Sequence, residues 1–117
     1  MIKVYCYDRC STCRKALNWL IKNGIEHEVV DIKENHPDKE TLRKYYILSG
    51  HPLKRFFNTS GIQYREMGLS QKLSEMSEDE QLSLLSSDGM LVKRPLAVGD
   101  GFVMTGFNDE EWSAKLK

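Results

Sequence analysis

Cys10 and Cys13 form a Cys-x-x-Cys motif near the N-terminus, and cysteine thiolates are the nucleophiles of disulfide exchange. Residues 2–7 alternate in polarity and are rich in β-branched and aromatic side chains, which predicts a strand. From Cys13 to Leu20 apolar residues recur at the spacing of one helical face, which predicts a helix. Cys10 then lies at the helix N-terminus, where unpaired N–H groups and the helix dipole favour an anion. We therefore expect Cys10 to be the nucleophile and Cys13 the resolving thiol.

Metal binding is the alternative interpretation of the motif. A structural zinc site usually needs a second pair of ligands at regular spacing, and His27, His36 and His51 do not supply one. We therefore expect no metal and no bound cofactor. The third cysteine, Cys6, stands in the predicted strand, and free cysteine is among the most buried residue types. We expect Cys6 to be an inert core residue.

Length and composition are those of a single cytoplasmic domain. The 117 residues can bury a core without help from disulfides or metals. Lys plus Arg and Asp plus Glu both number 17, so the net charge is zero, which argues against nucleic-acid or membrane partners recognised by bulk charge. No stretch approaches the roughly 20 apolar residues of a membrane-spanning helix, and no signal-peptide core is present. In a reducing compartment, a Cys-x-x-Cys is more often redox-active or metal-binding than structural.

The elements around the motif make a β-α-β unit, a helical block and a β-β-α unit. The first helix ends at Asn23-Gly24, and the strand after it should pair in parallel with the first strand through a right-handed crossover. The Gly99-Asp100-Gly101 turn between two apolar runs predicts an antiparallel hairpin. Residues 62–73 show no clear period. The expected strands are at 2–7, 25–32, 96–98 and 102–104, and the expected helices are at 11–22, 37–49, 53–57, 77–85 and from 108 onward.

Three segments together resemble the ArsC/Spx family, which combines glutaredoxin-type arsenate reductases with Spx-like transcriptional regulators. They are residues 10–16 (CSTCRKA), 64–69 (YREMGL) and 93–96 (KRPL), in the family's order and approximate spacing. The resemblance covers almost the whole chain. It implies an α/β, thioredoxin-like fold: a mixed four-stranded sheet in one domain, residues 1–117, with a helical insertion at about 37–87. It also implies a cis peptide bond at Arg94-Pro95.

The sequence departs from the arsenate reductases of this family at the residues that hold the oxyanion. Those enzymes use three arginines, and only the middle one is clearly present, as Arg94. The other two positions fall near Asn58 and Gly106, although Lys54 or Arg55 lies close enough in sequence to substitute. Because two cations are missing, we expect arsenate reduction to be weak or absent.

The Cys-x-x-Cys form resembles the Spx-like branch, whose members bind the C-terminal domain of the RNA polymerase alpha subunit. The resemblance carries two of that branch's partner-binding positions onto Gly50 and Arg94. Two function classes are therefore open. One is an oxidoreductase, either arsenate reductase-like or a thiol-disulfide oxidoreductase, and the other is an Spx-like redox-switched regulator.

For the enzyme, the expected partner is an external thiol reductant, thioredoxin or glutathione. We favour this class because its chemistry is carried by identifiable residues, whereas a partner surface is not. The catalytic residues expected from the sequence and the resemblance are Cys10, Cys13 and Arg94, and the expected substrate-positioning residues are Ser11, Thr12 and Pro95.

Overall fold

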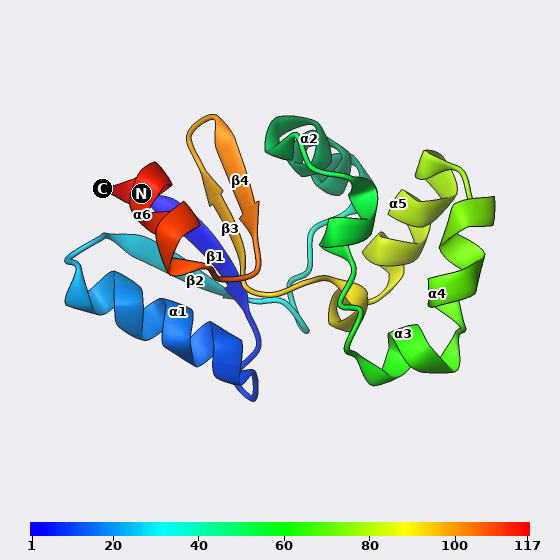
Figure 1. Ribbon diagram of the computed structural model, residues 1–117, viewed down its shortest axis with the longest axis horizontal. Helices are drawn as coiled ribbons and strands as arrows, with labels where there is room; N and C mark the ends of the chain where they lie inside the picture. Colours follow the sequence, from blue (N-terminus) through cyan, green and yellow to red (C-terminus); the bar gives the residue numbers. More distant parts are fainter.

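A four-stranded mixed sheet forms the centre of the protein (Figure 1). The computed structural model describes residues 1–117, and its strands lie in the order β2-β1-β3-β4. Strand β1 pairs in parallel with β2 and antiparallel with β3, and β3 and β4 form a hairpin. The strands are β1 (Ile2–Cys6), β2 (His27–Asp31), β3 (Leu96–Gly99) and β4 (Phe102–Thr105). The α/β thioredoxin-like arrangement expected from the sequence is confirmed.

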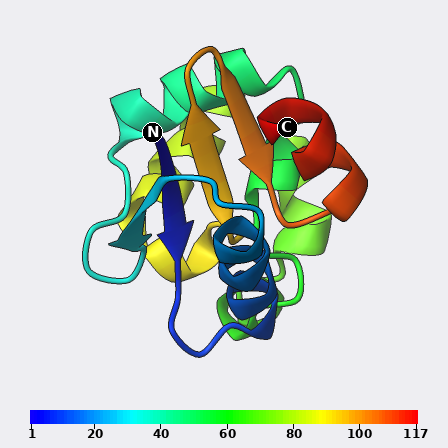
Figure 2. The same cartoon turned by 90° about the vertical axis from the view of Figure 1, so that its left-hand side faces the viewer.

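Helices cover both faces of this sheet. The α-helices are α1 (Ser11–Lys22), α2 (Lys39–Ser49), α3 (Ile62–Glu66), α4 (Leu69–Lys72), α5 (Glu78–Ser87) and α6 (Asp109–Leu116). Three short 3-10 turns complete the chain, η1 (Leu53–Phe56), η2 (Leu73–Glu75) and η3 (Gly89–Leu91). Figure 1 shows α1 and α6 on one side of the sheet and the block from α2 to α5 on the other; Figure 2 views the sheet from the α1 side. No helix has both the length and the apolar character needed to cross a membrane.

The alternation of β1 divides the core between the two faces, because successive side chains of a strand point to opposite sides. Val4 and Cys6 pack with α1 and with Trp112 of α6, whereas Tyr5 packs with the helical block, including Leu42 of α2. The carboxyl end of β1 leads directly into the turn before α1. The strand therefore places the start of α1 at the carboxyl end of β1, in the middle of the sheet.

The helical block is organised by caps and by ion pairs between α2 and α5. Asp38 caps α2, and Ser77 and Glu80 form the expected capping box of α5. Asp79 of α5 binds Lys39 and Arg43 of α2, which joins the two helices at the surface. Residues 62–75, where the sequence showed no clear period, form α3, α4 and η2. Each is at most five residues long, too short for a helical period to show in the sequence.

Candidate active site: a dithiol pair beside a polar cavity

Cys10 is the N-cap residue of α1, as expected from the sequence. Its Sγ accepts a hydrogen bond from the backbone N–H of Cys13 at 3.4 Å, and its own N–H donates to the Tyr7 carbonyl at 3.0 Å. The first turn of α1 has no acidic residue, so no carboxylate there opposes a negative charge on the sulfur. The Cys10 side chain is half-buried and lines a cavity. This placement leaves the Cys10 sulfur within reach of a ligand in the cavity.

Cys13 lies behind Cys10 in the first turn of α1 and is only 1% exposed. A hydrogen bond with the buried thiol of Cys6, together with burial, raises the pKa of Cys13 above its usual range. All three cysteines are free thiols. Sequence reasoning placed Cys6 in the core but missed its contact with Cys13. The available signal was the alternation of β1, which puts Cys6 on the same face as the helix that carries Cys13.

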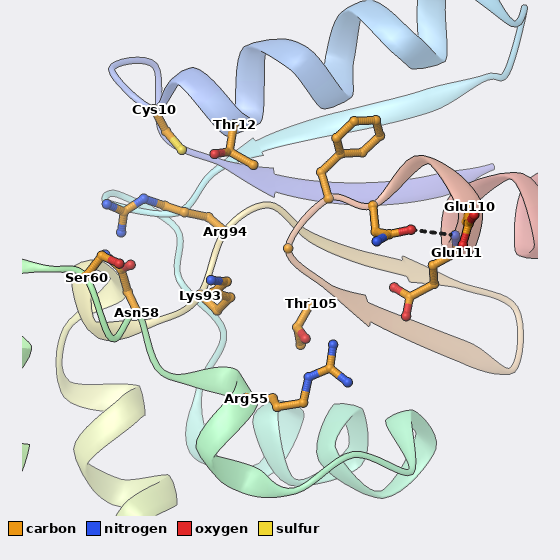
Figure 3. A pocket seen from close by; sticks show the side chains of 13 residues that line it. Cys10, Thr12, Arg55, Asn58, Ser60, Lys93, Arg94, Thr105, Glu110 and Glu111 are labelled. Carbon is orange, nitrogen blue, oxygen red and sulfur yellow. Dashed lines mark hydrogen bonds between the residues drawn. The ribbon is translucent and has the colours of Figure 1, made fainter. Parts of the chain in front are cut away.

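A cavity of about 750 Å³ opens beside Cys10 (Figure 3). It lies between the start of α1, the segment after η1, the loop before β3 and the start of α6, so segments distant in sequence build it together. Only two of its thirteen lining residues are hydrophobic. The lining residues are Cys10, Thr12, Arg55, Asn58, Ser60, Lys93, Arg94, Thr105, Gly106, Phe107, Asn108, Glu110 and Glu111.

Arg94 is a cation fixed at the cavity wall. The Arg94-Pro95 peptide bond is cis, as expected. The guanidinium donates through Nη1 to the Met90 carbonyl at 3.2 Å and lies over the Tyr7 ring, 5.3 Å from its centroid. Its Nε is buried and has no hydrogen-bond partner in the protein. A buried, unpaired donor of a charged group costs free energy.

The resemblance places the two further arginines of the arsenate reductases near Asn58 and Gly106, and both of these residues line the cavity. Two other cations line it as well, Arg55 and Lys93. Of the two substitutes considered from the sequence, Arg55 reaches the cavity, whereas Lys54 lines only neighbouring ones. Lys93 was missed, although its place next to Arg94 in the KRPL segment was a usable signal.

Lys93 takes up space beside Gly106. A Cβ atom on Gly106 would lie 3.3 Å from Cε of Lys93, and Gly106 has φ +76°, a conformation that disfavours other residues. Any larger residue at position 106 would therefore be strained and would push against the lysine.

Of the other residues proposed from the sequence, only Thr12 lines this cavity. Thr12 is in the cavity wall, and Ser11 is exposed at the first position of α1. Pro95 is buried, and its carbonyl accepts a hydrogen bond from the Gly106 N–H at 2.8 Å. Gly50 ends α2 with φ +67° and lines none of the cavities described here. The fold thus brings Cys10, Thr12 and Arg94 together and leaves Gly50 outside the group.

Charged groups of both signs line the cavity without forming ion pairs. Arg55, Lys93 and Arg94 supply positive charge, and Glu110 and Glu111 supply negative charge from the first turn of α6. The ion pairs of the protein all lie on α2 and α5 instead, with Lys39, Glu40, Arg43 and Asp79. No cluster of three or more His, Cys, Asp or Glu side chains is suited to a metal ion. The arrangement is therefore suited to thiol chemistry on a charged ligand.

Comparison with known proteins finds relatives that match nearly the whole length of this chain. It is 52% identical over 108 residues to the uncharacterised protein YusI of Bacillus subtilis strain 168, with 92% of each chain covered. A solved structure of an ArsC family related protein from Bacteroides fragilis is 50% identical, with a TM-score of 0.96 and coverage of 99% of this chain and 97% of that one.

Both branches named above are represented among the relatives. The global transcriptional regulator Spx 2 of Bacillus anthracis is 25% identical over 111 residues, covering 95% of this chain and 83% of the regulator. Arsenate reductases are among the structural relatives. The family model for the ArsC family matches residues 5–115. The chain therefore belongs to the ArsC family.

Proposed function

We propose that this protein is a thiol-disulfide oxidoreductase in which Cys10 attacks the substrate and Cys13 resolves the mixed disulfide. The observation that carries the proposal is the placement of the two thiols. Cys10 caps α1 and lines a cavity that also contains Arg94, while Cys13 is buried within the same helical turn. One sulfur is thus open to a ligand, and the other is shielded from the cavity behind Cys10.

The reaction is an exchange of sulfur-sulfur bonds. The Cys10 thiolate attacks one sulfur of the substrate disulfide, so a Cys10-substrate bond forms and the other sulfur leaves as a thiolate. Cys13 then loses its proton to water and attacks Sγ of Cys10, which forms the Cys10-Cys13 disulfide and releases the second substrate thiolate. The substrate gains two electrons and the protein loses two. An external thiol reductant, thioredoxin or glutathione, returns them to the protein.

The residues around the pair have separate roles in this scheme. Arg94 provides the fixed positive charge beside the developing thiolates, and Thr12 contributes a hydroxyl at the cavity wall. Ser11 and Pro95 position the substrate indirectly, through the backbone at the two sides of the cavity. Mixing reduced protein with a small disulfide and mapping the oxidised peptides tests the scheme. A Cys10-Cys13 bond supports it, and failure of Cys10 to react with any disulfide contradicts it.

Alkylation of the reduced protein should modify Cys10 first and Cys13 far more slowly. Cys10 is half-buried and lies at a helix N-terminus, whereas Cys13 is buried and its raised pKa keeps it protonated at neutral pH. We expect the rate at Cys10 to exceed the rate at Cys13 by about tenfold or more, with the Cys13 rate still rising above pH 9. Mass spectrometry of peptides after short iodoacetamide pulses measures this order. Preferential labelling of Cys13 or Cys6 would reverse the assignment.

Arsenate turnover with either reductant should be weak or absent. A tetrahedral oxyanion beside Cys10 needs several charge-assisted donors, and the residues at the two missing arginine positions are Asn58 and Gly106. Each lost guanidinium costs on the order of 1.5 to 3 kcal/mol of binding. A coupled assay that follows oxidation of the reductant measures the rate. Saturable arsenate turnover that disappears in Lys93→Met or Arg55→Gln would instead show that these cations replace the arginines.

Regulation of transcription is the second candidate function, and exposed apolar residues beside Gly50 favour it. Ile47 and Leu48, at the end of α2, are 70% and 48% exposed. If the protein is an Spx-like regulator, this end of α2 would contact the C-terminal domain of the RNA polymerase alpha subunit. The cysteine pair would then act as a redox switch. Titration of that domain into reduced and oxidised protein, with Ile47→Glu and Gly50→Arg as variants, tests the reading. Binding unchanged by both variants would exclude this surface.

A further inference from the structure

The cavity beside Cys10 is larger than an oxyanion needs. Its volume of about 750 Å³ falls in the range of sites that hold whole small molecules, roughly 300 to 1,000 Å³. A second cavity of about 360 Å³ adjoins it and shares Arg55, Lys93 and Thr105 with it, whereas Cys10, Thr12 and Arg94 line only the first. These three shared residues therefore lie where the two cavities meet, on the side away from the cysteine. Figure 3 shows Arg55 on the wall opposite Cys10.

The three shared residues have unused hydrogen-bonding capacity. Thr105 is only 6% exposed, yet its hydroxyl lines both cavities and makes no hydrogen bond within the protein. Arg55 is held by one contact, between Nη1 and Nδ1 of His51 at 3.2 Å, which leaves its other N–H groups free. The ammonium of Lys93 has no hydrogen bond or ion pair, while its stem packs beside Gly106. A free hydroxyl beside two cations that form no ion pair is a site for an anion, because the anion accepts hydrogen bonds from all three groups.

We propose that Arg55, Lys93 and Thr105, the anchor site, bind a carboxylate of the small disulfide whose sulfur reacts with Cys10. This inference rests on the proposed function and adds the class of substrate, a disulfide of a carboxylate-bearing thiol. The carboxylate accepts hydrogen bonds from both cations and from the Thr105 hydroxyl, and takes no part in the bond exchange. It holds the substrate so that its sulfur lies against Cys10.

The start of α6 gives the cavity a negatively charged side. Glu110 and Glu111 repel an anionic group placed at the start of α6, and neither is neutralised by an ion pair. A carboxylate in the cavity is therefore driven toward the anchor site and not distributed over the whole lining. Arg55 and Lys93 repel a cationic group at the anchor site, so the site discriminates between disulfides by the sign of their substituents.

A pair of probes that differ only in charge tests the anchor site. Dithiodipropionate carries two carboxylates, its dimethyl ester carries none, and cystamine carries two ammonium groups. In the Cys13→Ser background, the reaction stops at the mixed disulfide, so mass spectrometry gives the rate of adduct formation at Cys10. We expect the diacid to react about tenfold faster than the ester, the size of one charge-assisted hydrogen bond, and cystamine to react most slowly.

The variants Lys93→Met and Arg55→Gln should each slow the diacid severalfold more than the ester, so that the preference for the diacid falls. Methionine keeps the stem that packs beside Gly106, and Lys54→Met is the matched control, because Lys54 is exposed and lines only neighbouring cavities. An equal ratio of diacid to ester rates in parent and variants would overturn the anchor site. A variant that slows the diacid and the ester equally would also overturn the anchor site, since such slowing indicates a structural effect. Failure of all three probes to modify Cys10 would instead contradict the proposed function.

Discussion

Cys10→Ser should abolish reduction of any disulfide substrate, with a loss of about a thousandfold or more. A serine hydroxyl at the same N-cap position is not ionised near neutral pH, so the cavity loses its nucleophile while the cap hydrogen bond to residue 13 is kept. Stability should therefore change little. Turnover of a small disulfide, followed by release of free thiol, measures the activity, and thermal unfolding verifies the fold.

Cys13→Ser should have a different effect from Cys10→Ser. The first bond exchange still occurs, but the mixed disulfide on Cys10 accumulates because nothing resolves it. Cys6→Ala is the matched control: Cys6 is buried beside Cys13 but has no role in the exchange, so the Cys10-Cys13 disulfide should still form. A mixed disulfide that resolves as fast in Cys13→Ser as in the parent, or that resolves through Cys6, would contradict the assignment of the two sulfurs.

Arg94→Ala should slow the reaction of Cys10 with disulfides by about ten- to a hundredfold while leaving the protein folded. The guanidinium is the fixed cation of the cavity, so its removal takes away positive charge beside the developing thiolates. Arg94→Lys should restore the rate only in part, because a flexible ammonium cannot reproduce the planar guanidinium held over Tyr7.

The rate of adduct formation in the Cys13→Ser background measures the effect of Arg94 on the first step alone. Arg65→Ala serves as control, since Arg65 is exposed and hydrogen bonds only to the Ser60 carbonyl through Nη2. Equal rates in Arg94→Ala and the parent would remove Arg94 from the reaction. The cysteine pair would then act with the helix terminus alone.

The sequence by itself placed the strands, the longer helices and the candidate nucleophile, but not the short helices α3 and α4. Alternation in residues 2–7 and the helical spacing after Cys13 are local patterns, and they place Cys10 at a helix N-terminus without knowledge of any distant residue. Caps at Asp38, Ser77 and Asn108 are also local, because a cap residue and the N–H it binds are three residues apart. The cis bond at Arg94-Pro95 followed from the resemblance to the family.

Only the tertiary structure decided what surrounds the nucleophile. Arg55, Lys93 and Thr105 belong to η1, the loop before β3 and the end of β4, and they meet because the helical block folds back beside the sheet. Contacts across such distances in sequence depend on packing, which no local pattern records. The Cys6-Cys13 contact also depends on packing. It forms because Cys6 points to the face of β1 on which α1 packs. Residue spacing could point to Cys10 as the candidate nucleophile, but the shape and charge of its cavity came from the packing of the layers.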